Sequence, residues 1–137
     1  MIKEEEILVL KDICSRLYCN TITNLVVQWN QENYNIIAIG FGRVTLVKPF
    51  MSKTSGSPLI SEIRPYLRPL SDMTEEEKDE IQQLDPCISL DIDKFDEYIH
   101  IANFEQLDYL NKHYLDYRGL IPRGLAKIAP KGMYQFN

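Results

Sequence analysis

The hydrophobic spacing of this chain changes near residue 21, and that change restricts the fold more than any other feature. Apolar residues from 4 to 18 recur every three or four positions, which predicts an amphipathic helix. Its apolar face comprises Ile7, Leu10, Ile13, Cys14 and Leu17, and its polar side Glu4, Glu5, Lys11, Asp12 and Arg16. Three runs rich in β-branched and aromatic residues follow, at Thr21–Trp29, Tyr34–Phe41 and Arg43–Phe50. Such runs are typical of short strands, so the fold class is α+β.

The connections between these runs indicate an antiparallel meander. Asn30 to Asn33 fits a four-residue hairpin loop. Gly40 and Gly42 mark either a second turn or a bulge within one bent strand. We therefore expect a small antiparallel sheet of about three strands, covered by the N-terminal helix and two later helices.

The middle of the chain, residues 51–86, contains a loop, an extended proline-containing stretch and one further helix. Residues 51–58 read as a polar loop, and the prolines that follow Arg64 and Arg68 favour extended backbone there. Thr74 and Glu77 form a capping-box pattern that begins a helix ended by Asp85-Pro86.

A last helix is predicted from Asn103, the N-cap, to Tyr117, with Gln106 completing the cap and Gly119 after its end. Its apolar face comprises Phe104, Leu107, Leu110, Tyr114 and Tyr117. Residues 87–101 are ambiguous, because Ile88, Leu90 and Ile92 alternate as in a strand whereas Phe95, Tyr98 and Ile99 have the spacing of a helical turn. Residues 120–129 are apolar but interrupted by proline and glycine, which predicts an irregular C-terminal segment.

Length and composition favour one globular domain over residues 1–137, with 45% hydrophobic and 26% charged residues. No apolar stretch approaches the roughly 20 residues of a spanning helix. The acidic N-terminus differs from a secretory signal, so a cytoplasmic location is expected. Cys14, Cys19 and Cys87 lack metal or disulfide spacing and are expected to be reduced and partly buried.

Two segments carry a resemblance to known proteins. They are IRPYLRPLSDMTEEEKDEI (63–81) and LDYLNKHYLDYRGLIPRGLAKIAPKGMY (107–134), about a third of the chain. They resemble small proteins of phages and mobile elements of Bacteroides-type gut bacteria. That group has no assigned activity, so the resemblance implies provenance and no functional residue. Acidic residues are usual in the group near Lys127 and Lys131, and this chain departs from the pattern there.

Charge is distributed unevenly along the chain. Residues 118–137 hold four basic residues and no acids, although the whole chain has a net charge of −5. Basic segments 43–68 and 118–131 indicate an anion-binding site, with Arg64, Arg68, Arg118 and Arg123 as its candidate residues. A sequence pI near 5.0 argues against a dedicated nucleic-acid-binding domain.

The chain has eight tyrosines. Tyrosine favours contact surfaces because it combines a large apolar area with a polar tip, although the edge of a core uses it in the same way. The candidate partner surface comprises Tyr66, Tyr109, Tyr117 and Tyr134. The leading hypothesis is a non-enzymatic accessory factor that binds another protein, and the alternative is a nucleic-acid or polyanion binder.

Residues suited to catalysis or metal binding show no known spacing. Asp91, Asp93, Asp96 and Glu97 lack the glycine and closing glutamate of a calcium loop, and they read better as a solvated acidic edge. His100 and His113 belong to no zinc pattern. We therefore expect no metal, no cofactor and no catalytic residue, and a hydrolase or metal enzyme using Asp91, Asp93 and a histidine is the least favoured class.

Overall fold

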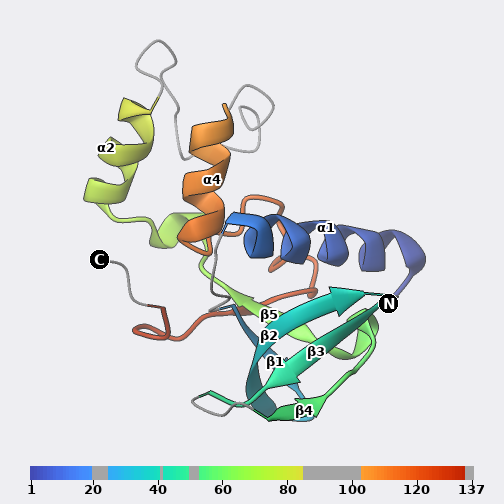
Figure 1. Ribbon diagram of the computed structural model, residues 1–137. Coiled ribbons are helices and arrows are strands. Elements are labelled where there is room, and N and C mark those ends of the chain that lie inside the picture. Colours follow the sequence, from blue (N-terminus) through green and yellow to red (C-terminus); the bar gives the residue numbers. More distant parts are fainter. Residues whose placement is uncertain (20–24, 41, 50–52, 85–102, 135–137) are drawn as a thin grey trace.

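The computed structural model describes residues 1–19, 25–40, 42–49, 53–84 and 103–134, and it has an α+β fold (Figure 1). Its α-helices there are α1 (Lys3–Cys19), α2 (Glu75–Gln83) and α4 (Phe104–Lys112). The strands are β1 (Val26–Trp29), β2 (Glu32–Gly40), β3 (Arg43–Val47), β4 (Thr54–Gly56), β5 (Arg64–Leu67) and β6 (Lys127–Ile128). They form one mixed sheet in the order β4-β3-β2-β1-β5-β6, so the predicted class is confirmed and the predicted strand number is too low.

The three strands that the sequence did not indicate are short. β4 lies in the predicted polar loop, β5 contains Pro65, and β6 lies in the segment predicted to be irregular. β6 runs parallel to β5, and β4 runs antiparallel to β3. Backbone hydrogen bonds to existing strands create these elements, and such bonds require no hydrophobic pattern.

Strand β5 contains Pro65, which has no backbone N–H to donate to a neighbouring strand. The Tyr134 hydroxyl supplies a link between β1 and β5 beside this position. β5 lies between β1 and β6, and Pro65 is opposite Val27. Next to this pair, the Tyr134 hydroxyl accepts a hydrogen bond from the Val26 N–H at 3.0 Å and donates to the Tyr66 carbonyl at 2.8 Å. The C-terminal segment therefore joins β1 and β5 through a side chain.

The first hairpin has a two-residue turn, so the predicted loop over residues 30–33 was too long. Asn30 and Gln31 have φ angles of 51° and 66°, and Trp29 pairs directly with Glu32. Two positive φ angles are required by the turn type that matches the twist of paired strands. Of the two alternatives for Gly40 and Gly42, a second turn is correct, because Gly40 pairs with Arg43 across a hairpin. The bulge in β2 lies elsewhere, between Ile36 and Ala38.

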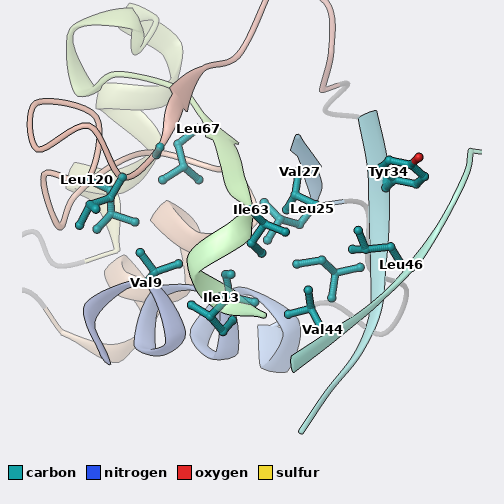
Figure 2. Packing of buried hydrophobic residues seen from close by; sticks show 14 of the residues in the cluster. Val9, Ile13, Leu25, Val27, Tyr34, Val44, Leu46, Ile63, Leu67 and Leu120 are labelled. Carbon is teal, nitrogen blue, oxygen red and sulfur yellow. The ribbon is translucent and has the colours of Figure 1, made fainter. Parts of the chain in front are cut away.

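The main core lies between α1 and one face of the sheet, called here the inner face (Figure 2). Val9 and Ile13 of α1 are fully buried there with Val27, Ile36 and Leu46. The buried face of α1 is therefore rotated relative to the predicted one: Ile7 and Cys14 are exposed, whereas Asp12 and Arg16 are buried. Exposure of Cys14 also corrects the expectation of a partly buried thiol.

Both predicted capping boxes are present, at Thr74–Glu77 and Asn103–Gln106. The helix after Asn103 ends at Lys112, five residues before the predicted Tyr117. Tyr114 has a φ angle of 57°, which an α-helix does not tolerate, and Leu115 pairs with Arg68 as an isolated bridge. Phe104 is 86% exposed and does not belong to the core.

The second, smaller core joins α2 to α4 and to the segment that follows α4. It contains Met73, Ile81, Leu110, Leu115 and Tyr117.

No helix in the described ranges is long and apolar enough to span a membrane. The ambiguous segment 87–101, the acidic residues Asp91 to Glu97, His100 and Cys87 lie outside the described residues.

Candidate functional site

Arg68, a predicted anion-binding residue, faces carboxylates of the protein itself. Its Nη1 and Nη2 donate to the two oxygens of Glu77 at 2.8 and 2.7 Å, and its Nε lies 3.5 Å from Asp72. Nη1 also bonds the His113 carbonyl, and Nη2 the Asp72 carbonyl. This bidentate geometry uses the guanidinium group fully, so its positive charge is balanced within the protein.

Glu77 connects Arg68 to α4. His113 Nδ1 lies 2.9 Å from Glu77 Oε2, and the His113 ring stacks on Tyr109 at 4.0 Å between centroids. Burial alone would raise the pKa of the Glu77 carboxyl. Hydrogen bonds from Arg68, the Thr74 backbone and His113, together with the charge of Arg68, outweigh this effect and lower the pKa to about 2. Glu77 is therefore an ion-pair partner rather than a proton donor at neutral pH.

A pocket of about 340 Å³ lies beside this network. Its lining includes Arg68, Asp72, Thr74, Lys131 and Tyr134. Because the guanidinium donors of Arg68 already bond Glu77, Asp72 and His113, the pocket offers an anion little beyond Lys131.

Arg118, a second predicted anion-binding residue, is part of a buried network on α1. Its Nη1 lies 3.0 Å from Asp12, and its Nη2 donates to the Ser15 hydroxyl. Arg16 binds the same carboxylate through Nε and Nη2 at 2.8 and 2.9 Å. Arg118 also lies over the Tyr117 ring, 4.5 Å from its centroid. This network attaches the segment after α4 to α1.

The predicted partner surface is largely internal. Tyr66 and Tyr117 are buried, and the Tyr134 ring stacks on Tyr114 at 3.9 Å between centroids. The Tyr109 hydroxyl donates to Glu80, and burial together with this bond raises the pKa of the phenol. These tyrosines make contacts within the protein and are not gathered into one exposed surface.

A largely apolar pocket lies between α1 and the short 3₁₀ helix Ile60–Glu62. It has a volume of about 250 Å³ and is lined by Lys3, Glu6, Ile7, Leu10, Gly42, Leu59, Ile60 and Ser61. Ile7 is 44% exposed and Leu59 is 42% exposed. We call this pocket the α1 groove.

The sequence does not predict the α1 groove, because the residues that form it look like a core residue and a loop residue. Ile7 has the spacing of a core residue, and Leu59 follows a proline in what reads as a loop. The rotation of α1 towards Val9 and Ile13 leaves Ile7 at the surface, and only the fold brings Leu59 beside it. The single sequence signal was Asp12 and Arg16, an i,i+4 pair on the same side as Val9 and Ile13.

The described ranges contain no group of three or more histidine, cysteine, aspartate or glutamate side chains that could hold a metal ion. Arg123 is exposed on the surface, and Arg64 is half-buried on the sheet.

No family model, no curated protein and no solved structure matches this chain, so its function is inferred from its own geometry.

Proposed function

We propose that this protein is a non-enzymatic binding protein whose α1 groove receives an apolar side chain of another protein. The observation that carries this proposal is the exposure of Ile7 and Leu59 at the rim of an apolar pocket. Exposed aliphatic side chains around a concave surface favour association, because contact with a partner removes their area from water.

The charges around the α1 groove favour one kind of partner. Glu4, Glu5 and Glu6 lie in the first turn of α1, and Glu62 is the last residue of the 3₁₀ helix Ile60–Glu62. Lys3 lines the groove, Lys11 and Arg43 adjoin lining residues along the chain, and Arg43 donates to the Ser57 carbonyl. Four carboxylates, of which Glu6 lines the groove, therefore lie on or next to its lining, against three bases. This excess favours a partner segment that carries an aliphatic or aromatic anchor next to lysine or arginine.

The biological setting of this proposal comes from the resemblance of residues 63–81 and 107–134. It supports an accessory factor of a phage or mobile element that acts in the cytoplasm on a protein of its host or its own element.

Selection from a displayed library of random peptides tests this function, because such a library samples many partner sequences at once. The wild-type protein is expected to enrich peptides with an apolar anchor beside basic residues. Ile7→Glu and Leu59→Glu place a charge in the groove and are expected to weaken binding of a synthetic enriched peptide by about tenfold or more, which corresponds to about 1.4 kcal/mol.

Phe104→Glu is the matched control, because Phe104 is exposed on α4 and lies outside the groove lining. It should bind the peptide as the wild type does. Thermal melting confirms that each variant is folded. Failure to enrich any peptide, or equal binding by the wild type and the two groove variants, would contradict the proposal.

A further inference from the structure

The sheet has a second face that points away from α1, called here the outer face. Val27, Tyr34, Ile36, Leu46 and Leu67 are buried on the inner face, so the residues between them point outward. Strand pairing sets Gln28 opposite Asn33 on one side and opposite Arg64 on the other, and it sets Tyr66 opposite Lys127. The outer face of β2, β1, β5 and β6 thus gathers Gln28, Asn33, Asn35, Arg64, Tyr66 and Lys127.

Acidic residues are missing from the outward positions of the described strands, although the chain has 20 acids. Arg64 donates from Nη1 to the carbonyls of Ser61 and Ile63, which leaves Nε and Nη2 for a ligand. Lys127 is exposed, and neither base has a carboxylate partner among the residues that the structure describes. Within the described ranges no carboxylate neutralises either charge, unlike those of Arg68 and Arg118.

Amide groups lie next to these bases in fixed orientations. The Tyr66 hydroxyl donates to Asn33 Oδ1 at 3.0 Å and accepts from Gln28 Nε2 at 3.3 Å. This arrangement leaves Gln28 Oε1 as an acceptor and Asn33 Nδ2 as a donor, and the Asn35 amide makes no hydrogen bond within the described part of the chain. The outer face thus offers cations together with both donors and acceptors.

From this combination we infer that the outer face binds single-stranded nucleic acid. Arg64 and Lys127 would contact phosphates, and the amides would bond base edges, which carry donors and acceptors. A carboxylate side chain presents only acceptors, so it would pair with Arg64 and Lys127 but would not use Gln28 Oε1, whereas a base edge offers both kinds of group. Tyr66 is buried, so affinity comes from charge and hydrogen bonds rather than from stacking on its ring. This site is independent of the α1 groove.

Fluorescence anisotropy with a labelled single-stranded oligonucleotide of about 12 nucleotides tests the inference. Two phosphate contacts predict a slope of about −1.4 for log K against log salt. Binding should therefore weaken roughly sevenfold between about 50 and about 200 mM salt. The double variant Arg64→Gln, Lys127→Gln should bind more weakly and lose most of the slope. Asn35→Asp, which adds a carboxylate to the face, should also weaken binding.

Lys11→Gln with Lys112→Gln is the matched control, because it removes the same charge from exposed positions on α1 and α4. It should retain the wild-type affinity and slope, as should Ile7→Glu. Melting curves show whether each variant is folded. The inference is overturned by absence of binding, by equal losses in the two double variants, or by displacement of the oligonucleotide by polyglutamate at matched charge, which would indicate an acidic protein ligand.

Discussion

Two ion networks inside this protein use the same chemistry at different depths. In the Asp12 network, the side chains of Asp12 and Arg16 are both 0% exposed, and Arg118 closes the group. In the Glu77 network, the side chains of Arg68 and Glu77 are each 11% exposed, and Asp72 at its edge is 66% exposed. Each network holds one arginine that the sequence suggested as a surface site.

The difference in depth teaches how the two networks act. Charges that are fully removed from water depend on one another, because a buried ion without its partner is strongly unfavourable. Charges near the surface retain some contact with water, which reduces both the cost of burial and the value of the pair. The Asp12 network should therefore govern stability more strongly than the Glu77 network.

The largest effect is expected for Asp12→Ala. It removes the carboxylate that binds both Arg16 and Arg118, and it should lower the free energy of unfolding by about 3–5 kcal/mol. Urea denaturation followed by circular dichroism measures the loss.

A matched double variant isolates the charge effect. Asp12→Ala with Arg16→Met removes the buried cation as well, and it should recover a substantial part of the lost stability. A loss below about 1 kcal/mol for Asp12→Ala alone would show that depth does not distinguish the two networks.

A smaller effect is expected for Glu77→Gln. The change removes the charge that Arg68 binds with two nitrogens, but Asp72 and the His113 carbonyl still contact Arg68. The free energy of unfolding should fall by about 1–3 kcal/mol. A loss equal to or larger than that of Asp12→Ala, in the same denaturation experiment, would reverse the comparison.

The pH dependence of stability is expected to reveal the Glu77 network directly. The pKa of Glu77 is about 2 in the folded protein, below its ordinary value of 4.5, so the unfolded chain takes up the proton first as pH falls. The stabilisation by Glu77 is complete above about pH 4.5 and is lost as pH falls towards about 2.

Denaturation of the wild type and of Glu77→Gln across this range measures that contribution. The difference between the two proteins should shrink as pH falls from 4.5 to 2. A difference that stays constant over this range would mean that the charge of Glu77 does not stabilise the fold.

The smallest effect is expected for Asp72→Asn. Its carboxylate lies 3.5 Å from Arg68 Nε at the solvent-exposed edge of the Glu77 network. The change should alter the unfolding free energy by about 0–1 kcal/mol, and added salt should reduce the difference further. A larger effect would place Asp72 among the essential members of the network.

Local features of the fold were predictable from the sequence. The capping boxes at Thr74–Glu77 and Asn103–Gln106 were predicted correctly, as was the α-helix that precedes the sheet. The predicted lengths of the first hairpin turn and of the last helix were wrong. Asn30 and Gln31 resemble ordinary loop residues, and the positive φ of Tyr114 depends on how the chain after α4 meets Arg68.

The candidate sites were much less predictable than the fold class. Four arginines were grouped by their position in basic segments, but two of them meet internal carboxylates. Lys127 and the amides of β1 and β2 were not singled out, because only strand pairing reveals that they share a face with Arg64. The α1 groove was hidden by the assumption that charged residues on a helix point outward.

What the sequence determined by itself was the class of the fold and the starts of the helices that begin at capping boxes. These depend on residues a few positions apart, whose interactions form in any context. Only the tertiary structure decided which charges are buried, which are free and which strands complete the sheet. Asp12 and Arg118 meet from positions 106 residues apart, and no local pattern encodes a contact that exists only after the chain has folded.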